Sequence, residues 1–396
     1  MFDLTTSSPA GSRLTADILT TILTTEGDHY PDPPVVVIES FEEYCTATHT
    51  IVEAWRNHAV KRQKEKSEGD PSSCDRYVGE ILPWFRGQTN ADHDLTPSIA
   101  RLSKDYSNIY GDVNTVEEYF QERFIRFARP YLAGSYPQDI VEWNYIMRHH
   151  AVPSRLLDWT KGSLIGLFYA VHNLIEEKYR NPNADQRPKD QDCAVWMLEP
   201  RRLMEMTTTK LFSAKENNKN HRVSSKEPMN KPRRNIASQD PKVKALRKLY
   251  FNDVRDFNDG KWTIYVDGMP ETLVDVDGLR DYPLPLIPSH ISRRLESHLS
   301  RFTLHSLVSS DGEVTEDLPK TDRSLIKFAQ DSFDSDDHWY LVKLIIPANK
   351  REEIARNLRM TGVGDMNFSQ DLDGLSKELE IRFRLGANDD HIKADD

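Results

Sequence analysis

The chain has 396 residues, of which 38% are hydrophobic and 29% charged, and its formal net charge is −11. This length can bury a sizeable core, and the acidic balance argues against a uniformly basic protein that coats nucleic acid. The three cysteines, Cys45, Cys74 and Cys193, lie far apart without CxxC spacing. This pattern indicates a reducing compartment and no zinc finger.

Residues 1–33 are rich in Thr, Ser and Pro, and we expect them to form a flexible leader. They lack the charged start and apolar core of a signal peptide. Elsewhere no apolar run approaches the length of about 18 residues that a membrane span needs. We therefore expect an intracellular protein, cytoplasmic or nuclear and not secreted, with no membrane contact.

The first elements predicted after the leader are a strand and a helix. Val35–Ile38 is an apolar run typical of a short buried strand. Ser40 and Glu43 have the spacing of a capping box, and apolar residues at helical spacing then continue to Trp55. The charged residues of Lys61–Asp75 predict a loop.

The middle of the chain alternates between strands and helices. A strand is expected over Ile81–Arg86, ending at Gly87, and a buried strand over Ala194–Leu198. Between them, apolar residues at helical spacing predict three helices, over Val116–Leu132, Val141–Arg148 and Leu164–Ile175.

The last third predicts two strands, Trp262–Val266 and Trp339–Ile346. Asn349 with Glu352 predicts the start of a helix that carries Ile354 and Leu358. Residues 371–374, Asp-Leu-Asp-Gly, then turn into a final helical segment. Strands and helices mix without a regular βαβ rhythm, which favours the α+β class.

A basic segment separates the two halves. Residues 201–234 contain ten Lys or Arg against three Asp or Glu and few large apolar side chains. This composition predicts a mobile insertion, extending to about residue 245, in an otherwise single domain over 34–396. It is either a solvated loop or a surface that approaches the phosphate backbone of DNA or RNA.

Two runs mix bulky apolar residues with charged and hydrogen-bonding ones. They are residues 84–88, WFRGQ, and residues 147–160, MRHHAVPSRLLDWT. Burying Arg, His or Asp without a partner costs roughly several kcal/mol, so such groups pair with each other or face a ligand. We therefore expect the two runs to line one site.

The two runs resemble the FRG domain, a family named after its Phe-Arg-Gly. WFRGQ, with LTPSIAR at 95–101, is similar to the family's opening motif, and RHHAVPSRLLDWT is similar to its central motif. Residues 294–304 resemble a later motif, although His298 and Ser300 stand where the family has Gln and Gly. Residues 340–375 resemble its terminal strand, helix and turn.

The FRG domain in turn resembles ADP-ribosyltransferases, which transfer ADP-ribose from NAD. The resemblance implies an α+β fold with an ADP-ribosyltransferase-like core, a mixed or antiparallel sheet surrounded by helices. It also implies cleavage of the nicotinamide–ribose bond of NAD and transfer of ADP-ribose, with a nucleic-acid base as one acceptor in toxin and defence settings. NAD is then a substrate, and no metal is expected.

Arg86 and Gln88 are candidates for binding the substrate. A guanidinium at a strand end can hold a phosphate or carboxylate with two parallel hydrogen bonds. Gly87 permits close approach of the backbone, and Gln88 adds a donor and an acceptor. Alternatively, Arg86 pairs with a carboxylate of the protein such as Asp94.

The end of the central motif and the residues directly after it form a second candidate group. Asp158 or Thr160 can cap the helix that follows, and a helix start is also an anion site. Arg155 and Ser163 would add a charge and a hydroxyl for a phosphate. The resemblance implies hydroxyl support of the nicotinamide side from Thr160 and Ser163, and an aromatic–hydroxyl segment at Phe302. Trp159 or Phe302 would be the stacking aromatic.

His149 and His150 are open to several roles. Adjacent helical side chains diverge by about 100°, so the pair cannot chelate one metal. One of them is either a catalytic base or a group that holds a ribose hydroxyl, or it is an ordinary core histidine. His150 is the candidate we carry forward.

The catalytic carboxylate is left open. Asp371 either forms an Asx-turn or stabilises a developing oxocarbenium ion, and Asp158 and Glu296 are alternatives. The predicted catalytic residues are therefore Arg86, His150, Asp158 and Asp371. Two other classes remain, a non-catalytic module that binds a nucleotide or phosphate, and a scaffold in which these residues pair internally.

Overall fold

The computed structural model describes residues 32–69, 81–102, 113–132, 137, 140–172, 191–207, 263–264, 274–275, 283–287, 297–305, 324–333, 338–368 and 376. The chain divides into two compact units. Unit 1 comprises Met1–His93, Gly162–Glu199 and Phe333–Asp396. Unit 2 comprises Asp94–Lys161 and Pro200–Ser332.

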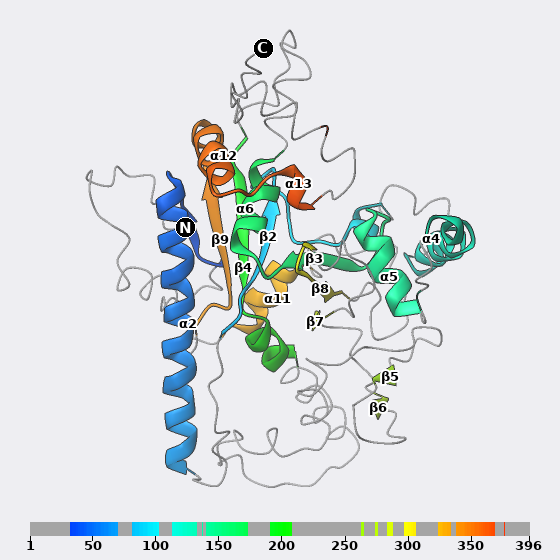
Figure 1. The fold of residues 1–396 in the computed structure, drawn as a ribbon. Helices are drawn as coiled ribbons and strands as arrows, with labels where there is room; N and C mark the ends of the chain where they lie inside the picture. The colour runs from blue at the N-terminus through cyan, green and yellow to red at the C-terminus, as the bar shows by residue number, and fades with distance from the viewer. Residues whose placement is uncertain are drawn as a thin grey trace, which may run out of the picture. The chain divides into compact units, whose positions relative to one another are not determined.

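Unit 1 contains a mixed sheet of four strands (Figure 1). Their order is β1 (Val35–Val37), β9 (Leu341–Ile346), β4 (Cys193–Leu198) and β2 (Trp84–Gln88). β1 runs parallel to β9, whereas β4 is antiparallel to both β9 and β2. Every residue of β4 is buried, as expected of an apolar strand with a neighbour on each side.

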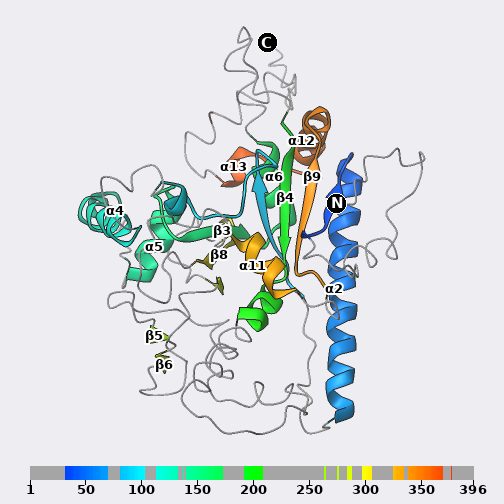
Figure 2. The ribbon, with the colours of Figure 1, turned by 180° about the vertical axis from the view of Figure 1, so that it is seen from behind.

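Helices cover the sheet of unit 1. The long α2 (Phe41–Gly69) and the short α6 (Ser163–Val171) are joined by a hydrogen bond of 2.6 Å from the Tyr44 hydroxyl to the Ser163 carbonyl oxygen. α6 packs on β2 and β4, and α12 (Arg351–Met360) packs on α6 and α2, as seen from both sides in Figures 1 and 2. The remaining helical pieces are η5 (Ala348–Lys350) and α13 (Asp365–Phe368).

Two glycines set the distance between α6 and β2. A Cβ on Gly87 would lie 2.2 Å from the carbonyl oxygen of Gly166 and 2.5 Å from the amide nitrogen of Ala170. In return, a Cβ on Gly166 would lie 2.7 Å from the Cβ of Phe85. Both positions need glycine because backbone atoms occupy the space of a side chain.

Unit 2 contains an antiparallel sheet in the order β3 (Leu156–Thr160), β8 (Ser300–Leu304) and β7 (Leu284–Leu286). A separate strand pair joins β5 (Thr263–Ile264) to β6 (Val274–Asp275). The helical elements of the unit are α4 (Val113–Ala128), η2 (Arg129–Tyr131), α5 (Ile140–His149) and α11 (Leu325–Ser332). α5 packs on β3, and α4 packs on α5, where the rings of Phe124 and Trp143 meet edge to face at 6.3 Å.

The α+β class and a mixed sheet are confirmed by these elements. The predicted strands at 35–38, 81–86, 194–198 and 339–346 and the predicted helices at 116–132, 141–148 and 164–175 all occur, with shifted ends. The capping box is confirmed in part, because the Glu43 amide donates to Ser40 Oγ at 3.1 Å. The Glu43 carboxylate accepts from the amide of Glu39 rather than from that of Ser40.

Three predictions of local structure are wrong. The charged segment from Lys61 is not a loop at its start, because α2 continues to Gly69. Asn349 does not cap α12, because residues 348–350 form a 3₁₀ turn and Lys350 is the N-cap, with no side-chain bond. Residues 201–207 belong to no mobile insertion, since residues 200–207 are helical and bury Leu203 and Met204.

Several predictions fall outside the described residues. They concern most of the leader, the insertion from residue 208 to about 245, and the turn at residues 371–374. Across the described part of the chain, no helix is both long and apolar enough to cross a membrane.

Candidate functional site

The predicted site residues are divided between the two units. Unit 1 holds Arg86, Gly87, Gln88 and Ser163, and unit 2 holds the larger share. The residues in unit 2 are His150, Arg155, Asp158, Trp159, Thr160 and Phe302. Asp371 lies outside the described residues.

The Phe-Arg-Gly run lies on β2 and has one packing role. The sequence predicts that Gly87 allows a ligand to approach the backbone. In the structure it is the backbone of α6 that approaches Gly87 closely. Gln88 is buried, and its side-chain oxygen accepts a hydrogen bond of 2.8 Å from Trp196 Nε1. Arg86 is half-buried between them. The side-chain oxygen of Gln88 therefore positions the indole of Trp196 on the neighbouring strand β4.

The helix start was predicted to be capped by Asp158 or Thr160, and this prediction is wrong. Both residues lie within β3, and α6 begins at Ser163 with Gly162 as its N-cap. No side chain caps this helix. The prediction fails because the central motif ends in a short strand and not in a helix turn.

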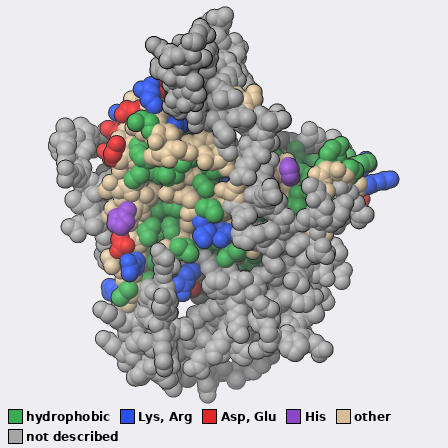
Figure 3. All heavy atoms as spheres, viewed as in Figure 1, with side chains coloured by type: hydrophobic (Ala, Val, Ile, Leu, Met, Phe, Trp, Pro, Cys, Tyr) green, Lys and Arg blue, Asp and Glu red, His purple; other side chains and the backbone are tan. Residues whose placement is uncertain are grey.

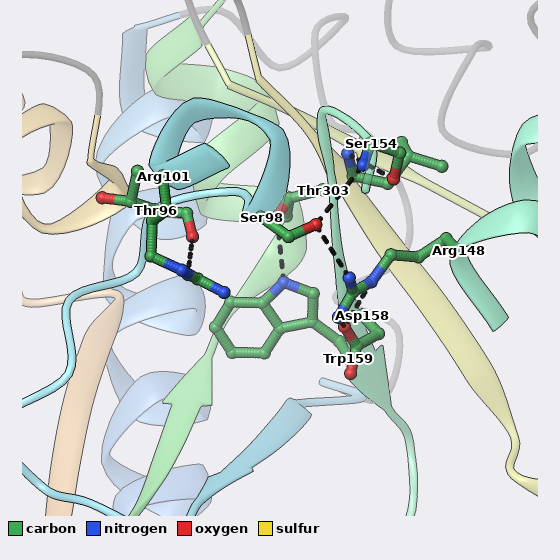
Figure 4. Close-up of polar contacts among 9 residues, drawn as sticks. Thr96, Ser98, Arg101, Arg148, Ser154, Asp158, Trp159 and Thr303 are labelled. Carbon is green, nitrogen blue, oxygen red and sulfur yellow. Dashed lines mark hydrogen bonds and ion pairs between the residues drawn. The ribbon is translucent and has the colours of Figure 1, made fainter. Parts of the chain in front are cut away.

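The central motif builds a polar network around Arg148 (Figure 4). Arg148 Nε donates to Asp158 Oδ1 at 2.8 Å, and its Nη1 donates to Ser98 Oγ at 3.1 Å. Ser98 Oγ also accepts the amide of Ser154 at 3.3 Å. The side chain of Asp158 is 51% exposed, whereas the side chain of Arg148 is only 15% exposed. The network thus fixes a carboxylate that solvent can reach.

Arg155 forms a second ion pair, with Glu117 of α4. Its Nε donates to Glu117 Oε2 at 2.7 Å, and its Nη2 contacts the same oxygen. The Glu117 side chain is 6% exposed and that of Arg155 is 14% exposed. Arg155 was predicted to hold a phosphate, but here its guanidinium neutralises a buried carboxylate and ties α4 to β3.

Trp159 is buried and anchors β3 to β8. Its Nε1 donates to Thr303 Oγ1 at 2.9 Å, and Thr303 Oγ1 lies 2.9 Å from His305 Nε2. An indole nitrogen only donates, so the Thr303 hydroxyl oxygen accepts from Trp159 and also joins His305 to this chain of hydrogen bonds. The predicted stacking role of Trp159 is not supported, because its ring is enclosed at 3% exposure.

Thr160 and Phe302 are also enclosed. Thr160 Oγ1 donates to the carbonyl oxygen of His298 at 2.8 Å. Phe302 is fully buried and stacks on Tyr145 with ring centroids 5.0 Å apart. Their predicted contacts with a cofactor would require this part of unit 2 to open, so the structure gives both residues a packing role.

The histidine pair ends α5. His150 is exposed, whereas His149 is half-buried, and its ring lies 4.8 Å from that of His298. The next residue, Ala151, has a φ of 60°, a left-handed conformation that ends the helix. The turn leaves the His150 side chain at the surface of unit 2.

Sequence reasoning missed the supporting partners. Arg148 stood inside the central motif, but nothing in its spacing selected Asp158 as its partner. Glu117 and Thr303 carry no local signal, because each lies more than 35 residues from its partner: Arg155 is 38 residues from Glu117, and Trp159 is 144 residues from Thr303.

Unit 1 contains a buried cluster of ionisable groups that the sequence did not suggest. His338 Nε2 lies 2.9 Å from Glu199 Oε2, and both side chains are enclosed. His58 of α2 stacks on His338 with centroids 4.7 Å apart. Burial, followed by the neighbouring His338 and the cations Arg62 and Lys61, lowers the pKa of His58 to about 4.

A thiol and a phenol in unit 1 are held in their neutral forms. Burial raises the pKa of the Cys193 thiol to about 12, against a smaller opposing effect of Arg351. Burial also raises the pKa of Tyr44 well above its usual value. Neither group is therefore suited to act as a nucleophile. Within the described ranges, no set of three or more His, Cys, Asp or Glu side chains could hold a metal ion.

Comparison with known proteins identifies one segment. Residues 83–179 match the family model of the FRG domain. They begin directly before β2 and include α4, α5, β3 and α6. No curated protein and no solved structure matches the chain significantly. The motifs around WFRGQ and RHHAVPSRLLDWT lie inside this match, so the chain carries an FRG domain over residues 83–179.

Proposed function

We propose that the chain is an ADP-ribosyltransferase-like enzyme that cleaves the nicotinamide–ribose bond of NAD and transfers ADP-ribose to an acceptor. One observation carries the proposal. Asp158 has the only exposed side chain of β3, between buried residues on both sides, and it is held by Arg148, which itself donates to Ser98.

The chemistry requires such a group. As the glycosidic bond of NAD breaks, positive charge develops on the ribose, and a fixed carboxylate beside it lowers the barrier. An acceptor then attacks the ribose and releases a proton, while nicotinamide leaves as a neutral base. Asp158 would face the developing charge, and Arg148 would hold its orientation.

Two further residues support the proposal. Arg86 is half-buried and His150 is exposed, so each keeps some access to solvent. By contrast, Gln88, Trp159, Thr160 and Phe302 are buried, and their part would be to support the fold around the site.

The test is incubation of the purified chain with NAD labelled in its adenine part, alone and with pools of DNA, RNA and protein. We expect release of nicotinamide and label in one pool. Asp158→Asn should lower the rate by about 10²-fold or more, as loss of one electrostatic stabiliser does. Asp331→Asn is the matched control, since that carboxylate is 47% exposed and paired with Lys327.

A second candidate is a non-catalytic FRG module that binds a nucleotide or phosphate. The pairwise neutralisation of Asp158 by Arg148 and of Glu117 by Arg155 favours it. In that case the wild type would bind NAD without releasing nicotinamide. Arg86→Ala would bind NAD more weakly. Absence of both release and binding in the folded protein would exclude both candidates.

A further inference from the structure

An exposed stripe of aromatic and arginine side chains runs along α4 into η2. Tyr119, Phe127 and Tyr131 are 46%, 58% and 87% exposed. Together with Leu299 they are the exposed large hydrophobic side chains in the described part of unit 2. Three of these four side chains therefore lie on one helical stripe.

Two guanidiniums lie over rings of the same stripe. Arg123 Cζ is 5.2 Å from the ring centroid of Tyr119, and Arg126 Cζ is 5.8 Å from that of Phe127. Tyr119, Arg123, Arg126 and Phe127 follow helical spacing on α4, and Tyr131 lies at the end of η2. We name this set, Tyr119, Arg123, Arg126, Phe127 and Tyr131, the aromatic–arginine stripe. In Figure 3 hydrophobic and basic side chains lie next to each other where α4 appears.

The stripe is not a core face turned outward. Other side chains of α4 supply the packing, through Val116 against Ile99, Phe124 against Trp143, and Gln121 Nε2 to Asn144 Oδ1 at 3.0 Å. The helix therefore has a satisfied inner face. Apolar rings left at the surface in a group mark an interaction site.

We propose that the aromatic–arginine stripe binds single-stranded nucleic acid. Exposed rings offer their faces to unpaired bases, and arginines between them neutralise the phosphates. Tyr119 and Phe127 are eight residues apart, about 12 Å along the helix, so one strand could meet both rings. Glu122 is exposed beside the stripe, which leaves two arginines against one carboxylate among the described side chains.

The guanidiniums between the rings favour this partner over a protein. The centre of a protein interface would be apolar and depleted of charge. Here the rings of Tyr119 and Phe127 each lie beside a guanidinium. The role of the bound strand as the acceptor of ADP-ribose rests on the proposed function, whereas its binding does not.

The experiment measures binding of the full chain to fluorescently labelled oligothymidine and oligouridine by anisotropy, without NAD. We expect Tyr119→Ala and Phe127→Ala each to weaken binding about tenfold, the usual effect of losing one stacked base. Arg123→Ala with Arg126→Ala should reduce the slope of log affinity against log salt by about 1.4, or roughly 0.7 for each phosphate contact. A duplex should bind more weakly because its bases are not available for stacking.

The matched control is Arg356→Ala with Met360→Ala on α12. These two residues are exposed and four positions apart, as Arg123 and Phe127 are. Phe127→Tyr keeps a ring and should restore the affinity, and thermal melting checks the fold of every variant. Failure of the wild type to bind either strand, or equal affinity of stripe and control variants, would overturn the proposal.

The two proposals fail separately. If the chain binds the strand but releases no nicotinamide, the proposed role of the stripe holds and the proposed transferase activity is excluded. Nicotinamide release with no strand binding, or binding of a protein pool that the stripe variants abolish, retains the transferase and removes the nucleic-acid assignment.

Discussion

Arg155 and Glu117 form an enclosed ion pair in unit 2, with side chains 14% and 6% exposed. Enclosed charges cost free energy when they leave water, and their mutual attraction offsets this cost only while both are present. A substitution of one partner should therefore lower the free energy of unfolding more than a substitution of both partners.

We expect Arg155→Met to lower the free energy of unfolding by about 3–5 kcal/mol, because Glu117 is then buried without its cation. The double variant, Arg155→Met with Glu117→Leu, should recover most of that loss. Chemical denaturation of the three proteins measures the difference. Equal destabilisation by the single and double variants would show that packing and not charge pairing dominates.

The backbone at Ala151 provides a second residue-scale test. Its φ of 60° places a Cβ in the left-handed region, which costs roughly 1–2 kcal/mol. Glycine removes that cost but loses more entropy on folding, so Ala151→Gly should stabilise the protein by about 0.5–1 kcal/mol.

The matched control for Ala151→Gly is Ala59→Gly inside α2. Here the same substitution meets ordinary helical geometry and should destabilise by about 0.5–1 kcal/mol. Thermal or chemical melting compares the two variants. If both changes have the same sign, backbone strain at residue 151 is not the cause.

At the scale of elements, the contact of α6 with β2 decides how the signature strand is held. Gly87 and Gly166 let a helix backbone approach a strand backbone so closely that no side chain fits between them. This close packing explains why glycine directly follows Arg86 in the sequence. It also places Arg86 on a strand whose position is fixed by the helix.

Gly87→Ala should therefore destabilise the protein by about 3 kcal/mol or more, since the added methyl group meets backbone atoms that cannot rotate away. In Gly162→Ala the nearest atoms belong to the flexible side chain of Ile165, and we expect a loss of no more than about 1 kcal/mol. Denaturant unfolding of both variants tests the contrast. Similar stability of the two would contradict the close approach.

At the scale of the whole molecule, the cluster of His58, His338 and Glu199 couples stability to pH. His58 has a pKa of about 4 in the folded chain, against 6.5 for an unperturbed imidazole. Between these values the unfolded chain binds a proton that the folded chain refuses. This contribution to instability is absent above pH 6.5, grows as the pH falls toward 4, and stops growing below it.

We expect His58→Phe to be less sensitive to acid than the wild type between pH 6.5 and pH 4. Phenylalanine keeps a ring against His338 and cannot be protonated. Equilibrium unfolding at several pH values measures the effect, and His93→Asn, at an exposed histidine, is the control. Parallel pH profiles for wild type and His58→Phe would contradict the assigned cause.

Local patterns in the sequence predict the order of the principal strands and helices, the α+β class and the FRG segment. These features depend on local periodicity and on short motifs, which are written into neighbouring residues. Val35–Ile38, Ala194–Leu198 and the helix after residue 163 were accordingly predicted with only small errors at their ends.

The hydrogen-bonding and packing partners of the motif residues follow from the tertiary structure alone. Arg155 finds Glu117, Trp159 finds Thr303, and Gly87 meets the backbone of α6. Residues of matching chemistry are common along the chain, and no local pattern selects among them. Pairing across strands and helices makes that selection, because a buried polar group is stable only beside the one partner that the fold brings within reach.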